Sequence, residues 1–80
     1  SKLAQNGTFN MKNLLGESGT VYIPIPPNGN GSGKISISCG ERFMEFDAIS
    51  NDAEMIATGV HVRVTDIISG SILVVEKELS

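Results

Sequence analysis

The chain has 80 residues and a mass of 8.5 kDa, which is enough for one small domain. Apolar residues make up 40% of it, too many for a disordered tail but enough only for a thin core. The net charge of −3 argues against a surface that follows the phosphates of nucleic acid. A single cysteine and a single histidine exclude an internal disulfide and a multi-thiolate zinc site, and they leave little for catalysis.

No apolar run approaches the roughly 18 residues of a membrane span, and no signal peptide is recognisable. Since the chain begins with Ser1 rather than Met, we expect it to be part of a longer protein. Nine isoleucines and six valines stand against five leucines and four alanines. Branching at Cβ favours strands over helices, so this composition predicts an all-β domain.

Residues 1–13 are polar and show no apolar face. We therefore expect them to be a flexible linker or the remnant of a tag, and we expect the folded domain to span 14–80. Within that domain, apolar and polar residues alternate in five segments separated by turn residues. The alternation predicts strands at 20–25, 34–39, 42–50, 60–68 and 72–77.

Period-two alternation also predicts which side chains face the core. They are Val21, Ile23, Ile25, Ile35, Ile37, Cys39, Met44, Phe46, Ala48, Val60, Val62 and Val64. The last strand is apolar on both faces, which is typical of a barrel wall that is also covered from outside. Pro24 cannot donate a ladder hydrogen bond, so the end of the first strand should lie at an edge or a bulge.

Two connections are long. The first, 26–33, is rich in glycine and begins with Pro26, Pro27 and Asn28, and we expect it to be the most mobile loop of the domain. The second, 51–59, is predicted to be a short turn of helix or a loop that ends at Gly59. Five short strands at this spacing indicate a small barrel or sandwich.

The residues that could carry chemistry each favour a structural interpretation. Gly33 and Lys34 open a β-branched strand rather than a helix, so the phosphate-binding geometry of a Walker loop is not expected. Glu45 and Asp47 share one strand face and are interpreted as a solvated surface. His61 should be exposed on a strand, and Cys39 is expected to pack as a small apolar group.

A lipoyl- or biotinyl-type carrier domain is also not favoured, because the segment from Ala53 to Ile56 lacks the lysine that such a carrier modifies. We therefore predict neither an enzyme nor a cofactor or metal site. Apolar residues on otherwise polar faces are the more informative feature, and these are Phe43, Ile49, Leu73 and Val75. They indicate either a partner surface or a surface covered by 1–13 or 51–59, and the sequence leaves both open.

The order and spacing of the glycines, prolines and valines follow a recognisable pattern. Its first half is Gly16-x-x-Gly19-x-Val21, Pro26-Pro27-x-Gly29, Gly33-Lys34-Ile35 and Gly40. Its second half is Ala48-Ile49-Ser50, Ile56-x-x-Gly59-x-x-Val62-x-Val64 and Leu73-Val74-Val75. From about Leu14 to Glu78, the chain resembles the C-terminal soluble domain of the NfeD-like membrane proteins.

The resemblance implies a five-stranded OB-like barrel that follows a few transmembrane helices in a cell-membrane protein, with this domain on the cytoplasmic side. It also implies association with stomatin- and flotillin-type scaffold proteins in membrane microdomains. Some family members carry a serine-protease domain upstream, of which this chain contains no part.

We therefore expect a non-enzymatic, bacterial-type interaction module that docks to such a scaffold or to another copy of itself. The candidate contact residues are Phe43, Ile49, Pro26, Pro27 and Asn28. The alternative is a module that binds single-stranded nucleic acid by stacking bases on strand aromatics, which the negative charge makes unexpected.

Overall fold

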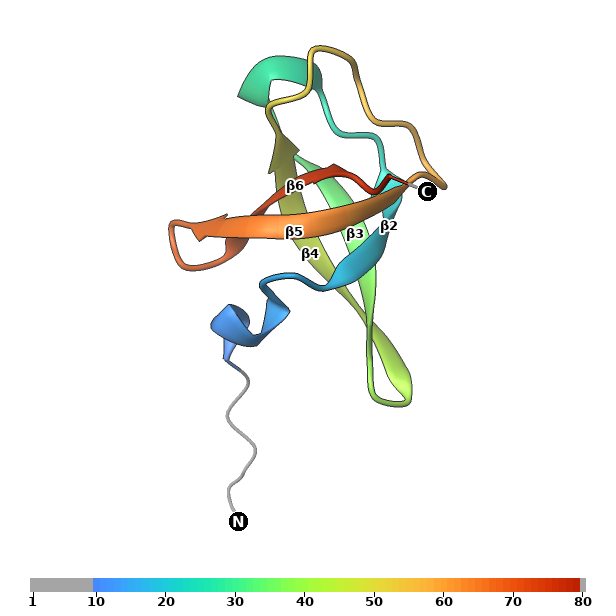
Figure 1. The fold of residues 1–80 in the computed structure, drawn as a ribbon, viewed down its shortest axis with the longest axis vertical. Coiled ribbons are helices and arrows are strands. Elements are labelled where there is room, and N and C mark those ends of the chain that lie inside the picture. Colours follow the sequence, from blue (N-terminus) through green and yellow to red (C-terminus); the bar gives the residue numbers. More distant parts are fainter. Residues whose placement is uncertain (1–9, 80) are drawn as a thin grey trace.

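A computed structural model describes residues 10–79, which contain five β-strands and two short 3-10 helices (Figure 1). The all-β prediction is confirmed, and the predicted strands at 42–50 and 72–77 have the observed bounds. In chain order the elements are η1 (Met11–Leu14), β2 (Ser18–Ile23), η2 (Pro27–Gly29), β3 (Gly33–Cys39), β4 (Arg42–Ser50), β5 (His61–Ile68) and β6 (Ile72–Lys77). No helix in this part of the chain is long and apolar enough to span a membrane.

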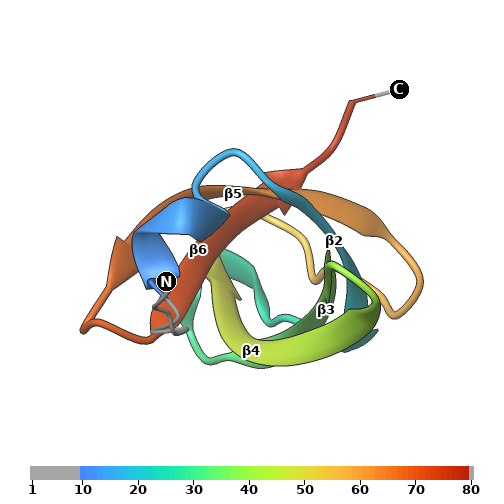
Figure 2. The same cartoon turned by 90° about the horizontal axis from the view of Figure 1, so that it is seen from below.

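The strands close into a barrel in the order β2-β3-β4-β6-β5, and β5 pairs back with β2. Every neighbouring pair is antiparallel except β4 and β6, which run parallel. Seen from below, the five strands surround a single interior (Figure 2). This closed five-stranded arrangement confirms the expected OB-like barrel.

Alternate side chains of each strand fill the interior. The buried apolar residues are Leu14, Val21, Ile25, Ile35, Ile37, Phe46, Ala48, Ile56, Val62, Val64, Leu73 and Val75. Most of them are β-branched, because a branched side chain packs well on a pleated wall. Six predicted inward residues of β3, β4 and β5 lie in this core, while Cys39, Met44 and Val60 pack against it half-buried.

One prediction about β6 is corrected. Leu73 and Val75 do not share a polar face with Phe43 and Ile49, because both are buried in the core. Strand β6 is paired with β4 on one edge and with β5 on the other, so it is part of the barrel wall. Its residues therefore point alternately into and out of the barrel. The outward residues of this strand are Ile72 and Val74, which are half-buried, and Glu76, which is exposed.

The first strand departs from simple alternation. It spans Ser18–Ile23 rather than 20–25, and Ile23, predicted to be inward, is 43% exposed. The pairing register with β3 shifts between Val21 and Ile23, as expected of a β-bulge, and this shift turns Ile23 outward. Ile25 is nevertheless buried, because it forms an isolated bridge with Ile56.

A close backbone approach follows the bulge. A Cβ atom added to Gly33 would collide with the backbone carbonyl groups of Ile23 and Pro24. Only glycine lets β3 begin this close to the end of β2. The expectation that the chain near Pro24 would leave regular pairing agrees with this arrangement.

Both long connections lie at one end of the barrel, at the top of Figure 1. Segment 51–59 is a loop and contains no helical turn. The Ile25–Ile56 bridge holds it, and the Asn28 N–H donates to the Asp52 carbonyl at 2.8 Å. The two loops therefore support each other.

The chain enters the barrel through η1. Most of the expected linker, 1–13, falls on residues 1–9, which lie outside the described part of the chain. The side chain of Asn10 caps η1 by accepting a hydrogen bond from the Lys12 N–H at 3.0 Å. Met11 packs half-buried against the core, and Leu14 is 3% exposed, so this turn already contacts the barrel.

Candidate functional site

Two candidate residues, Phe43 and Ile49, lie on the outer face of β4. Phe43 is 76% exposed, at the start of the strand, and Ile49 is half-buried near its end. They are separated by about 20 Å along the strand, at roughly 3.3 Å per residue. Between them, Glu45 and Asp47 are exposed on the same face. We call these four residues the β4 outer face.

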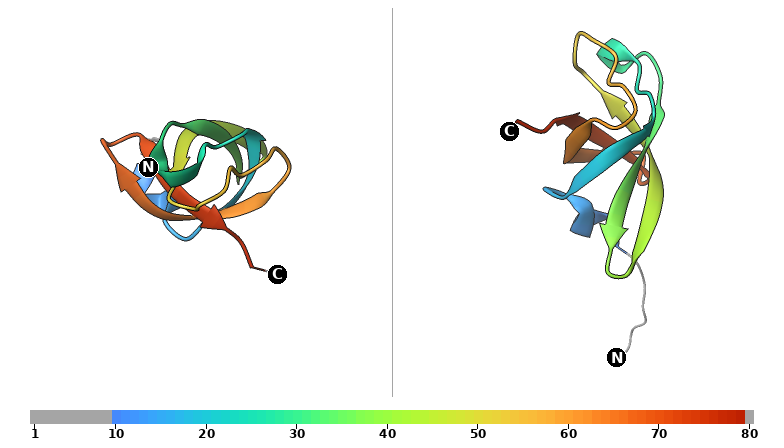
Figure 3. Two further views of the ribbon diagram at one scale, coloured as in Figure 1. Left: turned by 90° about the horizontal axis from the view of Figure 1, so that it is seen from above. Right: turned by 90° about the vertical axis from the view of Figure 1, so that its right-hand side faces the viewer.

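The other candidates, Pro26, Pro27 and Asn28, lie in and beside η2. This turn packs against β4, at the end of the strand that carries Ile49. The two ends of the barrel are clear in the right panel of Figure 3, where the β3–β4 hairpin points down and the η2 loop lies at the top. The structure therefore places the loop near Ile49 and away from Phe43.

Tyr22 is a further exposed aromatic residue that the list of candidates lacked. It is 55% exposed on β2, and it lines a shallow depression together with Phe43. The hydroxyl groups of Thr20, Ser36 and Thr58 line the same depression. Alternation places Tyr22 outside the barrel, but only the pairing of β2 with β3 and of β3 with β4 brings it near Phe43.

The chemistry of this depression is that of a contact surface. Its lining consists of two aromatic rings, neutral hydroxyl groups, Val21 and Gly59, and it contains no charged side chain. Nearby on the β4 outer face, Asp47 pairs with Lys34 at 3.3 Å. Aromatic rings beside hydroxyl groups contact apolar and polar groups of a partner without a large desolvation cost.

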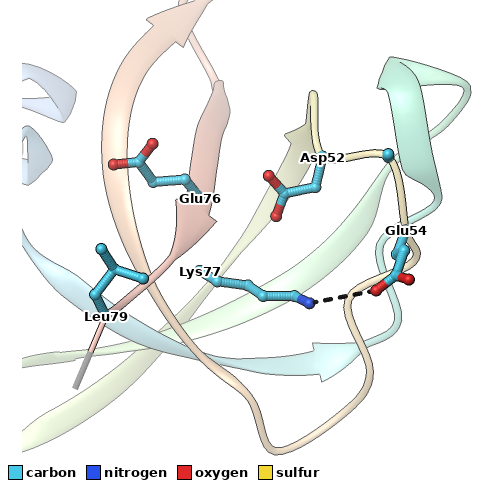
Figure 4. Close-up of a pocket in the computed structure, with 6 residues that line it drawn as sticks. Asp52, Glu54, Glu76, Lys77 and Leu79 are labelled. Carbon is cyan, nitrogen blue, oxygen red and sulfur yellow. Dashed lines mark ion pairs between the residues drawn. The ribbon is translucent and has the colours of Figure 1, made fainter.

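A second hollow lies between the 51–59 loop and the end of β6 (Figure 4). Asp52, Glu54 and Glu76 line it, and Lys77 spans it with its Nζ atom 3.9 Å from a carboxylate oxygen of Glu54. Among residues 10–79, no three His, Cys, Asp or Glu side chains are grouped so that they could hold a metal ion. The acidic side chains therefore form a solvated surface.

The two residues with the most reactive side chains, His61 and Cys39, lie among residues of the barrel wall and the core. A ring nitrogen of His61 lies 3.3 Å from the Thr20 hydroxyl oxygen on the outer surface. Cys39 is a free thiol that packs half-buried against the core, as a small apolar group would.

Several solved structures resemble this barrel, and they are soluble domains of similar size. No protein-family model matches the sequence, and no curated protein does so. The soluble domain of the NfeD protein YuaF from Bacillus subtilis is 30% identical, with a TM-score of 0.67 over 82% of this chain and 75% of that one. The chain belongs to the NfeD family.

Two further structures resemble this NfeD domain. The C-terminal domain of a stomatin operon partner protein from Pyrococcus horikoshii is 28% identical, with a TM-score of 0.68 over 86% of this chain and 94% of that one. A soluble domain from Corynebacterium glutamicum is 25% identical, with a TM-score of 0.65 over 85% and 97%. It belongs to a membrane protein implicated in regulation of membrane protease activity.

Proposed function

We propose that this NfeD domain is a non-enzymatic docking module of a membrane-anchored parent protein. It lies on the cytoplasmic side and binds a stomatin- or flotillin-type scaffold protein, with self-association as a competing mode. One relative by structure is named a stomatin operon partner protein, which supports a partner of this class.

The exposed Phe43 is the observation that carries the proposal. A large aromatic ring that is 76% exposed on a strand buries little of its area against residues 10–79. Aromatic residues also contribute more binding energy than most others when a partner buries them. Tyr22 beside it extends the apolar area.

The remaining candidates fit within the same interface. A standard protein interface covers about 800 Å² on each partner, a patch roughly 30 Å across. One partner that lies along the β4 outer face would therefore reach from Phe43 to Ile49 and to the adjoining Pro26, Pro27 and Asn28. We expect Phe43 to contribute most of the binding energy, and we expect Pro26, Pro27 and Asn28 to contact the periphery of the partner.

The depression between Tyr22 and Phe43 does not favour nucleic acid. Base stacking on aromatic residues acts together with cations that follow the phosphates. The residues that line this depression are neutral, and the net charge of the chain is −3. A labelled oligonucleotide at low salt should therefore bind no more tightly than the millimolar range.

The binding test uses a purified stomatin-type protein and measures its affinity for this domain by biolayer interferometry. Phe43→Asp should weaken binding about 30-fold or more, because burial of a hot-spot ring contributes at least about 2 kcal/mol. Ile49→Thr should weaken it less, because Ile49 is only half-exposed and Thr keeps the β-branched shape.

Leu79→Asp is the matched control, since it places the same charge on an exposed apolar residue of the C-terminal segment. It should leave affinity unchanged. If Phe43→Asp and Ile49→Thr bind the scaffold as the unaltered domain does, the β4 outer face is not the docking surface. Dimerisation on size-exclusion chromatography, lost in Phe43→Asp, would instead support self-association.

A further inference from the structure

Strand β4 is paired along one edge, but along only part of the other. Strand β3 pairs with it from Arg42 to Ala48, whereas β6 pairs with it only from Ala48 to Ser50. Within residues 10–79, no strand lies beside the segment 42–47 on the side away from β3. Helix η1 lies against β5, and none of its Cα atoms comes within 8 Å of a Cα atom of β4. The barrel is therefore closed at one end of β4 and open at the other.

The direction of the free backbone groups follows from the ladder. The Val21 N–H donates to the Val60 carbonyl on the β5 side of β2, so the neighbouring Thr20 faces β3 and its partner Ser36. Antiparallel residues alternate in direction, so Ile37 faces β4 and its partner Met44 faces β3. The N–H and C=O groups of Phe43 and Glu45 consequently point away from β3, towards the open edge.

This open edge is exposed on a projecting hairpin. Gly40 has a φ of 69° in the two-residue turn between β3 and β4, and the two strands extend beyond the rest of the barrel (Figure 1; Figure 3, right). The side chains of Arg42, Phe43 and Glu45 are exposed. A free edge of this kind presents unpaired N–H and C=O groups to which another strand can pair.

We propose that the open edge of β4, from Arg42 to Asp47, binds an extended segment of a partner protein as an added β-strand. The partner in this inference is the scaffold of the proposed function, and its segment supplies backbone groups to those of Phe43 and Glu45. Such strand addition derives affinity from main-chain hydrogen bonds and specificity from alternate side chains.

The outward side chains define the chemistry of that segment. Phe43 selects an apolar or aromatic residue beside it, and Glu45 selects lysine or arginine two positions away. Glu45 has no ion-pair partner among residues 10–79, whereas Asp47 is already paired with Lys34. The expected occupant is therefore a strand with alternating apolar and basic outward residues.

A second copy of this chain fits the edge less well. Antiparallel pairing of two β4 edges centred on Glu45 would place the two Glu45 carboxylates side by side. Like charges directly opposite each other destabilise a strand pair. The charge on the edge thus favours a basic partner segment over self-pairing.

The first test measures amide hydrogen exchange of the domain by NMR, with and without a stomatin-type protein. In the unbound domain the Phe43 and Glu45 amides should exchange rapidly, because no strand of residues 10–79 pairs with them on that side. With the scaffold bound, their exchange should slow at least about tenfold, as for other ladder hydrogen bonds. If the scaffold binds and the two amides remain unprotected, strand addition is wrong although the docking function stands.

The second test uses Glu45→Pro, with Glu45→Thr as the matched control. Proline removes the edge N–H but no bond to β3, and proline is tolerated on edge strands. Glu45→Pro should weaken scaffold binding about tenfold relative to Glu45→Thr. Equal affinity of the two variants, each folded by circular dichroism, would overturn the proposal.

A designed peptide separates this inference from the proposed function. An extended peptide whose outward positions, every second residue, are valine and lysine in turn, with threonine between them, should bind the domain and protect the Phe43 and Glu45 amides. Glu45→Lys should abolish that binding, whereas Glu54→Lys, which makes the same charge change in a loop at the other end of the barrel, should not. Protection by the peptide without any scaffold binding would support the edge site and refute the scaffold as its partner. No protection by either probe would refute the edge site.

Discussion

Ser50, at the end of β4, is a polar residue inside the apolar core of residues 10–79 and is fully buried. Its hydroxyl oxygen accepts a hydrogen bond from the Asp52 N–H at 3.0 Å. The bond satisfies the buried hydroxyl and also fixes the start of the loop that follows β4. This residue therefore links the barrel wall to the loop that packs against η2.

Replacing Ser50 by alanine should lower the free energy of unfolding by about 1–2 kcal/mol, because the Asp52 N–H would lose its partner in a partly buried site. Urea denaturation followed by circular dichroism would measure this change. Ser38→Ala, on the exposed surface of β3, is the control and should change stability by less than about 0.5 kcal/mol. Equal effects of the two substitutions would show that the Ser50 hydrogen bond has no net value.

Single residues also explain which sequence predictions failed. Ile23 looks inward by alternation, but the bulge after Val21 turns it outward. Leu73 and Val75 look misplaced only when the last strand is considered without its two neighbours. Alternation along a strand shows which residues face the core only if no bulge interrupts the strand and the buried side of the strand is known.

The two tight hairpins differ in the quality of their turns. In the β3–β4 hairpin, glycine occupies the position with positive φ, so the turn has no steric conflict. In the β5–β6 hairpin, Ser69 and Gly70 both have positive φ, at 52° and 74°, and the Ser71 N–H donates to the Ile68 carbonyl at 3.2 Å. This is the geometry of a type I′ turn, in which asparagine is preferred at the position of Ser69.

Ser69→Asn should therefore raise the free energy of unfolding by about 0.5–1 kcal/mol, because asparagine tolerates left-handed backbone better than serine does. The measurement is the midpoint of chemical denaturation. Ser71→Asn, at the last position of the turn, where φ is not positive, should give no gain. A loss of stability in Ser69→Asn would show that the exposed turn is not of this type in solution.

Strand β4 combines the two properties on which the proposed docking depends. Its outer face carries Phe43 and Ile49, and its free edge runs from Arg42 to Asp47. The sequence predicted the bounds of this strand correctly, and it placed Phe43 and Ile49 on the outward face. It could not predict the free edge, because the edge results from how far β6 extends along β4.

At the scale of the whole molecule, a chain of 80 residues has a small core, so each buried side chain contributes a large share of the stability. The barrel adds to that core by closing on itself and by covering one opening with the N-terminal turn. Leu14 is buried in this turn, and the adjoining Gly16 N–H donates to the Val64 carbonyl at 2.9 Å. The boundary between linker and domain remains a prediction near residue 14.

Leu14→Ala should lower the free energy of unfolding by about 2–4 kcal/mol, as expected for a leucine removed from a core. Leu15→Ala, at the neighbouring exposed residue, should cost less than about 1 kcal/mol. Thermal unfolding of both variants would check the difference. Similar midpoints would mean that η1 does not seal the barrel in solution.

The sequence by itself determined the all-β class, the five strands, most of the core and the resemblance to NfeD domains. These features depend on local properties: β-branching, alternation and the positions of turn residues. The sequence also indicated that Phe43 and Ile49 lie outside the core, because both interrupt a polar face.

Only the tertiary structure decided the bulge at Ile23, the proximity of Tyr22 to Phe43 and the separation of Phe43 from the η2 loop. It alone also decided where β4 has no neighbour. Each of these features depends on the pairing of strands that are distant in the chain. Alternation within one strand contains no information about its register with the next, which barrel closure fixes.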